Sequence, residues 1–178
     1  GAEADVFAPA ALDLFDGLEF HGLEGEPQLY AANVLTVIVS ADRGLDDVDL
    51  GDPGALDGLI VARCHPGVPC GSAADALIAE LELDLGNATV TSESNVRAVL
   101  SKVELGEADL GFVYRTDALS ADGDVVSTGW ALSEPSVVLG VAPLGSGDQA
   151  TVAADFADFV ADQRNADLFA SLGFAPAP

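Results

Sequence analysis

The chain has 178 residues, of which 49% are apolar, and its 30 Asp and Glu residues against 6 Lys and Arg give a net charge of −24. This length can bury one domain or two small lobes, and no apolar run approaches the roughly eighteen residues that would cross a bilayer. Because so negative a chain repels nucleic acid and anionic lipid, we expect neither as a partner.

The first predicted element is a strand-like phrase, EADVFAPA, at residues 3–10. No turn or helix cap precedes it, and the chain begins with Gly rather than with a charged and then apolar leader. Either a signal segment has been removed or sequence upstream of residue 1 is missing, and the strand-like start favours missing sequence.

Two β-type runs dominate the rest of the chain. NVLTVIVSA (Asn33–Ala41) and SVVLGVAPL (Ser136–Leu144) are β-branched, uncharged and bounded by polar or Pro-containing turns, which is typical of buried strands. The interval between them is long enough, at about a hundred residues, to form a domain of its own. We expect one lobe from residues 1–36 and 138–178 and a second lobe from residues 37–137.

Strands and helical patterns alternate within the second lobe. We expect strands at residues 58–63, 88–92 and 109–116, and helices at residues 71–81 and 95–105. In both helices the apolar residues recur at helical spacing, and Gly106 is placed to end the second helix. This βαβα order predicts a mostly parallel sheet covered by helices, and hence an α/β fold.

The last stretch, residues 150–174, has a helical pattern that places Phe156, Phe159 and Val160 on one face and ends at Gly173. Together with the beginning of the chain it would form the first lobe. Two lobes joined by two crossing strands, with a cleft between them, are suited to trapping a small ligand by hinge closure.

Both cysteines lie in one stretch, VARCHPGVPCGSAAD, which runs from Val61 to Asp75. The spacing of Cys64, His65 and Cys70 does not match common zinc sites, so we expect no metal. A catalytic pair of Cys64 and His65 is disfavoured because neighbours on a strand point to opposite faces. A disulfide between Cys64 and Cys70 is favoured if the protein works outside the cytoplasm, and two buried free thiols remain the alternative.

Two predicted helix starts offer main-chain chemistry. Cys70–Ser72 opens one helix and Asn95–Val96 opens the other. Free N–H groups at a helix start point along its axis and carry a partial positive charge, so two such ends aimed at one cleft could hold an oxyanion without Arg or Lys. The plainer interpretation is N-capping by Ser72, Ser92, Ser94 and Asn95, which most helices need.

Several other polar residues carry no functional prediction. We expect Glu104, Glu107 and Asp109 in a solvated turn rather than as paired catalytic carboxylates. Arg97 and Arg115 are expected to pair with surface acids. No nucleophile–base pair or metal cluster emerges from the sequence, so we do not expect an enzyme.

Three segments together resemble the periplasmic molybdate-binding proteins of ABC importers, a family of extracellular solute-binding proteins. These segments are VPCGSAAD (68–75), SESNVRAVLSKVELGEADLGFVYRTDALS (92–120) and FADFVADQRNADLFASLGF (156–174). In the family a Val-Pro-x-Gly turn starts one helix, and an Asn/Asp-Val-Arg helix runs through Val-Glu-x-Gly-Glu-Ala-Asp into a strand ending Val-Tyr-x-(Ser/Thr)-Asp-Ala. EADVFAPA and YAANVLTVIV also resemble phrases of the family, so the similarity covers essentially the whole chain.

The resemblance implies a two-lobed, type II periplasmic-binding-protein fold that captures molybdate, or tungstate, in the cleft between the lobes. It assigns the oxyanion donors to the backbone N–H of Cys70, the backbone N–H of Val96 and the hydroxyl of Tyr114. The sulfur of Cys70 would then only tie down the loop. The other two ligands of the family are serines upstream of EADVFAPA, so the first lobe would be incomplete and would lack its opening βαβ unit of roughly thirty residues.

The resemblance further implies an extracytoplasmic protein, periplasmic or anchored at the cell surface, that delivers the oxyanion to the membrane permease of an ABC importer. We expect a monomer without a cofactor, in which molybdenum is present only as the bound oxyanion. The alternative is the ligand-sensing domain of a transcriptional regulator with the same bilobal fold. A DNA-binding segment upstream would favour that alternative.

Overall fold

The structure, a computed structural model, describes residues 4–16, 23, 26–45, 47–121, 125–144 and 149–178. The chain divides into two compact units. Unit 1 comprises Gly1–Asn33 and Val137–Pro178, and unit 2 comprises Val34–Ser136. The chain thus changes unit at 33/34 and at 136/137, whereas the sequence suggests 36/37 and 137/138.

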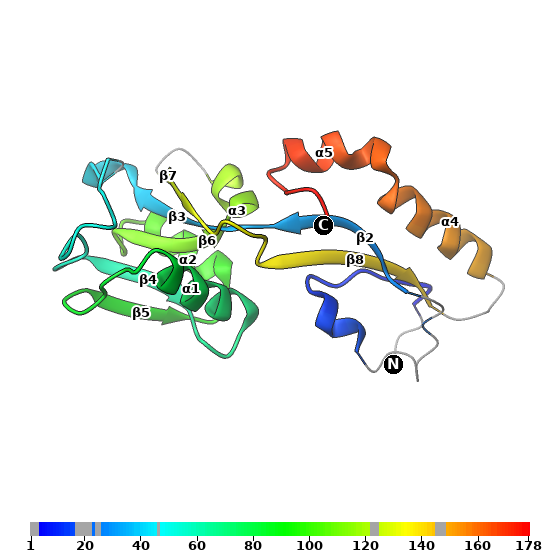
Figure 1. Cartoon of the computed structure of the whole chain (residues 1–178), viewed down its shortest axis with the longest axis horizontal. Coiled ribbons are helices and arrows are strands. Elements are labelled where there is room, and N and C mark those ends of the chain that lie inside the picture. Colours follow the sequence, from blue (N-terminus) through cyan, green and yellow to red (C-terminus); the bar gives the residue numbers. More distant parts are fainter. Residues whose placement is uncertain (1–3, 17–22, 24–25, 46, 122–124, 145–148) are drawn as a thin grey trace. The chain divides into compact units, whose positions relative to one another are not determined.

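Unit 2 is built on a five-stranded sheet (Figure 1). Its strands, in the spatial order β5-β4-β6-β3-β7, are β5 (Thr89–Glu93), β4 (Ile60–Cys64), β6 (Leu110–Tyr114), β3 (Leu35–Ser40) and β7 (Val125–Ala131). Strand β4 runs parallel to both β5 and β6, whereas β3 runs antiparallel to β6 and β7. Four of its five strands therefore run in one direction, as the βαβα order predicts, and β3 is the reversed strand, so two of the four pairings are parallel.

Helices cover both faces of this sheet because alternate residues of each strand point to opposite sides. Helix α1 (Pro69–Glu80) packs on the face that carries Val61, in a cluster with Leu77. Helix α2 (Val96–Glu104) packs on the opposite face, where Val99 and Val103 join a second cluster around the next strand residue, Ala62. A short helix, α3 (Arg115–Ser120), follows β6 directly and was not predicted from the sequence.

The ends of α1 and α2 have local causes. Asn95 caps α2, because its side-chain oxygen accepts a hydrogen bond from the N–H of Ala98 at 2.9 Å, and Gly106 adopts a left-handed φ of 68° just beyond the other end. Helix α1 instead begins with Pro69 in its first turn, preceded by Val68 in an extended conformation without a side-chain cap. The prediction that Ser72 caps α1 is wrong, because Ser72 lies inside the helix.

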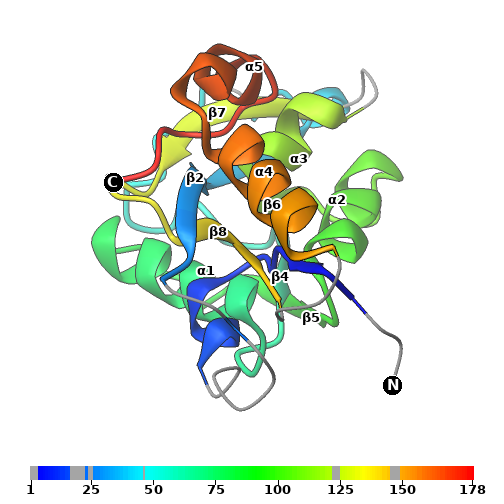
Figure 2. The same ribbon diagram turned by 90° about the vertical axis from the view of Figure 1, so that its right-hand side faces the viewer.

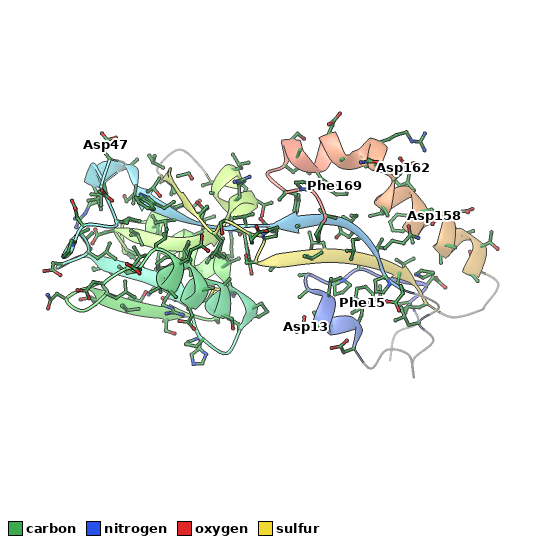
Figure 3. All side chains as sticks on the ribbon, viewed as in Figure 1. Asp13, Phe15, Asp47, Asp158, Asp162 and Phe169 are labelled. Carbon is green, nitrogen blue, oxygen red and sulfur yellow. A yellow bond between two sulfur atoms is a disulfide. The ribbon has the colours of Figure 1, made fainter. Side chains whose placement is uncertain are left out.

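Unit 1 is built on a three-stranded antiparallel sheet in the order β1-β8-β2. Its strands are β1 (Val6–Phe7), β8 (Val137–Pro143) and β2 (Gln28–Asn33). Helices α4 (Ala150–Ala161) and α5 (Ala166–Ser171) lie on one side of this sheet, and the 3₁₀ helix η1 (Leu12–Phe15) lies on the other (Figures 1 and 2). Figure 3 shows the same division at the level of side chains, with Phe15 below β8 and Phe169 above β2.

The helical tail differs from its predicted form in two respects. It is broken at Asp162, where a 3₁₀ turn, η4 (Gln163–Asn165), separates α4 from α5. Helix α4 also buries alanines against the sheet, whereas Phe156 and Phe159 are 51% and 63% exposed. The apolar face that the sequence pattern marks therefore points away from the described part of unit 1.

Gly111 shows how closely α2 lies on the sheet. A Cβ at this position would lie 2.8 Å from Cγ2 of Val103 and 2.9 Å from Cγ1 of Val99, and both valines are fully buried. We expect Gly111→Ala to lower the free energy of unfolding by about 1–3 kcal/mol, because the helix must move outward. Urea denaturation measures this. Gly51→Ala is the matched control, since its Cβ would meet only the side chain of Asp49, and a loss as large there would contradict the packing explanation.

Candidate functional site

The carboxyl ends of β4, β5 and β6 lie at one edge of the sheet of unit 2, since the three strands are parallel. Cys64 at the end of β4 is in register with Glu93 at the end of β5, and the N–H of His65 donates to the carbonyl of Glu93 at 2.8 Å. Helices α1 and α2 begin within a few residues of this edge, and Tyr114 is the last residue of β6. In open α/β sheets this is the edge at which ligands bind.

The first turn of α1 carries Cys70, and its main-chain N–H groups are not all bonded in the same way. The N–H groups of Gly71 and Ser72 both donate to the carbonyl of Val68, at 2.8 and 3.2 Å. The N–H of Cys70 has no acceptor among the residues that the structure describes. A Cβ at Gly71 would collide with the carbonyl group of His65, so only glycine lets the loop pass this close to the helix.

The first turn of α2 has the same character. The side chain of Asn95 accepts from Ala98 and its carbonyl accepts from Val99, which leaves the N–H of Val96 without an acceptor in the described part of the chain. The side chains of Val68 and Val96 pack against the buried cluster that contains Cys64 and Cys70. Both helix starts are therefore anchored to one buried cluster.

Tyr114 is half-buried and its ring packs against the apolar clusters on both faces of the sheet. Its backbone N–H donates to Oδ2 of Asp117 at 3.2 Å, which holds the start of α3 to the end of β6. Burial, and next the charge of Asp117, raise the pKa of the Tyr114 phenol above its usual value. The hydroxyl thus stays protonated at neutral pH and can donate a hydrogen bond.

A disulfide joins Cys64 to Cys70, with a Cα–Cα distance of 5.7 Å, and closes the loop between β4 and α1. Of the interpretations that the spacing leaves open, the structure therefore contains the disulfide. It leaves the amide of Cys70 as the only group of this residue that can donate to a ligand. In the described part of the chain, no three or more His, Cys, Asp or Glu side chains are grouped to hold a metal ion.

Arg63 is a polar residue at this edge that the sequence did not single out. It is the residue before Cys64 on β4, its side chain is only 11% exposed, and its guanidinium contacts the first turns of α1. A cation inside the apolar run LIVARC is the signal that could have drawn attention to it.

Asp109 lies at the opposite edge of the sheet and corrects another expectation. It is 4% exposed rather than solvated, accepts a hydrogen bond from the N–H of Ile60 at 2.7 Å and forms an ion pair with Nε of Arg43 at 2.6 Å. It therefore joins β6 to β4 and to the turn after β3, and it has a structural role.

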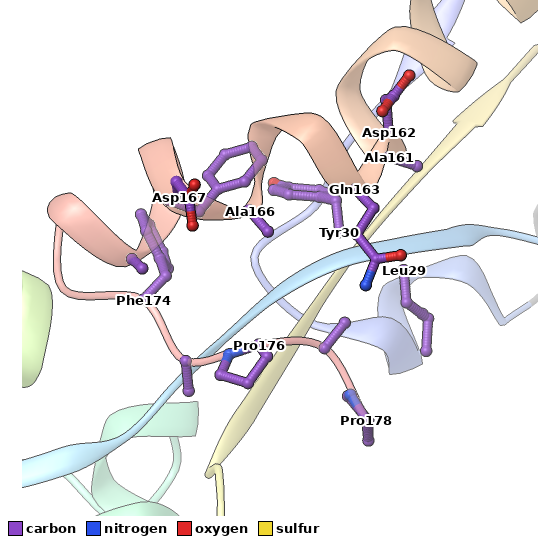
Figure 4. Close-up of a pocket in the computed structure, with 14 residues that line it drawn as sticks. Leu29, Tyr30, Ala161, Asp162, Gln163, Ala166, Asp167, Phe174, Pro176 and Pro178 are labelled. Carbon is purple, nitrogen blue, oxygen red and sulfur yellow. The ribbon is translucent and has the colours of Figure 1, made fainter.

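A cavity of about 490 Å³ lies in unit 1, between β2, α5 and the last residues of the chain (Figure 4). Tyr30, Phe169 and Phe174 form part of its wall. None of the predicted oxyanion donors lines it, since all three belong to unit 2. No helix in the described residues is both long and apolar enough to traverse a membrane.

Comparison with known proteins gives the family. The model of the bacterial extracellular solute-binding proteins matches residues 1–175. The molybdate-binding protein ModA of Mycobacterium tuberculosis is 33% identical in an alignment of 180 residues. The alignment covers 98% of this chain and 67% of that protein. The chain therefore belongs to the bacterial extracellular solute-binding proteins, and its resemblance to their molybdate-binding members is confirmed.

Solved structures give the fold. The periplasmic molybdate-binding protein of Azotobacter vinelandii matches with a TM-score of 0.74 and 24% identity, over 100% of this chain and 80% of that chain. The tungstate ABC transporter structure from Geobacter sulfurreducens matches with a TM-score of 0.65 and 12% identity, over 94% and 77%. The fold is that of type II periplasmic binding proteins, as the sequence predicts.

The carboxyl of Asp117 gives a pH-dependent prediction. Burial raises its pKa above the usual value, and this outweighs the hydrogen bond from Tyr114 and the charge of Arg97, which both lower it. The folded state therefore holds this proton more tightly than the unfolded state, and the carboxylate reduces stability above its folded pKa. Asp117→Asn should raise the free energy of unfolding at pH 7 by less than about 1 kcal/mol, because solvent screens a half-buried group.

The gain from Asp117→Asn should shrink as the pH falls through the folded pKa, where the wild-type carboxyl takes up its proton. Urea titrations at pH 7 and pH 4 measure the difference. Asp155→Asn, on the exposed surface of α4, is the control. A loss of stability at both pH values would show that the carboxylate is favourable and contradict the prediction.

The disulfide gives a second prediction at this site. Thiol labelling of the denatured protein without reductant should modify neither cysteine, and labelling after reduction should modify both. Reduction should lower the free energy of unfolding by about 2 kcal/mol, the loop-closure value for so short a loop. Two labelled thiols in the unreduced protein would contradict the bond.

Proposed function

We propose that this protein captures molybdate, with tungstate as the second choice, and delivers it to the membrane permease of an ABC importer. The observation that supports this most strongly is that two helix starts and Tyr114 share the carboxyl edge of one sheet. In this proposal the oxyanion accepts hydrogen bonds from the N–H of Cys70, the N–H of Val96 and the hydroxyl of Tyr114. The similarity to two molybdate-binding proteins supports this ligand class.

Neutral donors explain how a chain with a net charge of −24 can hold a dianion. The dipoles of helix starts act on a ligand within a few ångströms, whereas distant surface carboxylates are screened beyond a Debye length of about 8–10 Å. Neutral donors also suit a ligand that must be released to a permease. A buried pair of full charges would be harder to separate, because each charge would have to be solvated again.

Further donors would complete the site in this proposal. Three donors leave part of a tetrahedral dianion unsatisfied, and the family resemblance assigns the remaining contacts to serines of an opening βαβ unit. Val152, Phe156 and Phe159 form an exposed apolar stripe at helical spacing on α4. A stripe of this kind is what an additional segment of unit 1 would cover.

In this proposal the protein binds its ligand and catalyses no reaction, needs no cofactor, and works outside the cytoplasm as a monomer. The location is supported by the similarity to a periplasmic molybdate-binding protein. The sensor domain of a transcriptional regulator stays the alternative, because one fold serves both classes. Import of molybdate that depends on this protein would favour the first, and control of transcription by molybdate would favour the second.

Tyr114→Phe tests the proposal directly. The substitution keeps the ring that packs on both clusters and removes one donor to a charged oxygen, which is an interaction worth about 1.5–3 kcal/mol. We expect molybdate affinity of the full-length protein to fall roughly ten- to hundredfold, as measured by calorimetric titration, with little change in the melting temperature.

The chain offers a matched control in its second tyrosine. Tyr30 packs on Phe169 in unit 1, and burial raises its pKa as it does that of Tyr114. Tyr30→Phe should leave molybdate affinity unchanged. If Tyr114→Phe lowers the melting temperature and leaves affinity alone, Tyr114 is a core residue and the assignment of its hydroxyl is wrong.

A further inference from the structure

Arg63 connects the end of β4 to the first turns of α1. Its Nη2 donates to the carbonyl of Gly71 at 3.0 Å and contacts Oδ1 of Asp75 at 2.6 Å, and its Nε donates to the carbonyl of Cys64 at 3.3 Å. Gly71 and Asp75 are four residues apart on α1 and so lie on one face of the helix. One rigid, planar guanidinium thus contacts the strand and two successive turns of the helix.

We propose that Arg63 is a positioning residue for the oxyanion site, because it fixes the N–H of Cys70 at the edge of the sheet. This inference rests on the proposed function. Gly71 directly follows Cys70 in the first turn of α1. A movement of the Gly71 carbonyl would therefore also move the N–H of Cys70, the proposed donor. Arg63 itself is bound by a carboxylate and two carbonyls, and its charge is directed to them rather than to the ligand.

The disulfide alone does not fix the first turn of α1. It joins the side chains of Cys64 and Cys70, and rotation about its single bonds leaves the helix free to tilt about that point. Arg63 makes its contacts on the face of β4 opposite to that of Cys64, because consecutive strand residues alternate. Two attachments on opposite faces of one strand restrain the tilt that a single attachment permits.

Arg63→Gln in the full-length protein is the test. Glutamine keeps a polar end group, but its side chain is shorter and cannot reach all three acceptors. We expect molybdate affinity to fall roughly tenfold by calorimetric titration. We also expect faster hydrogen exchange at the amides of Gly71 and Ser72 in the absence of ligand, with exchange of Ala98 in the first turn of α2 unchanged. Arg63→Lys keeps the charge but lacks the planar fork, so it should restore only part of the affinity.

Arg43→Gln is the matched control. Arg43 also pairs with a carboxylate on this sheet, that of Asp109, but at the opposite edge. This variant should lose stability and keep its molybdate affinity within about twofold, which separates positioning from a general loss of stability. If Arg63→Gln destabilises too far to purify, Asp75→Asn removes the charge of one partner of the fork and should show a smaller change in the same direction.

The outcomes separate this inference from the proposed function. Wild-type protein that binds no molybdate overturns the proposed function, and the exchange rates of Gly71 and Ser72 then still test whether Arg63 holds the first turn. Wild-type protein that binds molybdate, with Arg63→Gln equal to it in affinity and exchange, overturns the role of Arg63. Wild-type affinity in Arg63→Lys would also overturn the role of Arg63. Lysine keeps the positive charge without the planar fork, so the charge alone would then account for the effect.

Discussion

The parallel pairing of β5, β4 and β6 is the constraint on which the candidate site depends. Parallel strands bring their carboxyl ends to one edge, and a chain that returns through helices must start each helix near that edge. Cys70, Val96 and Tyr114 come from three successive returns, and each lies close to the end of its strand. Donors that are far apart in the sequence therefore reach the same edge of the sheet without any local signal that links them.

Two glycines allow the close backbone contacts that fix the positions of α1 and α2 at this edge of the sheet. Gly71 lets the loop after β4 pass directly over the start of α1, and Gly111 lets α2 lie on β6 with two fully buried valines in contact. A larger residue at either position would move a helix whose N–H groups are proposed ligands. Here packing determines main-chain placement, and main-chain placement determines which polar groups face the ligand.

The two units differ in how completely they bury their apolar residues. The sheet of unit 2 is covered on both faces, and its strand β3, which lies between β6 and β7, is buried along its whole length. Unit 1 has a core that includes Ala31, Ala32, Ala153 and Ala157, while large apolar side chains of α4 remain exposed. Small residues allow α4 to lie close to β8 and β2, and they leave the opposite face of the helix for another contact.

The sequence alone determined the α/β class, four of the five strands of unit 2 and both helix starts to within a few residues, because each depends on periodicity, capping and turn residues that lie within a few positions of one another. It missed β7 and wrongly assigned Ser72 as a cap of α1. It also carried the family resemblance, through motifs that are contiguous in the chain. Tertiary structure alone decided that Asp109 is buried against Arg43, that the Phe156 face points outward, and that Arg63 holds α1. Each of these depends on a partner 8 to 66 residues away or on the surface that a neighbouring element covers, and no local pattern encodes such a distance.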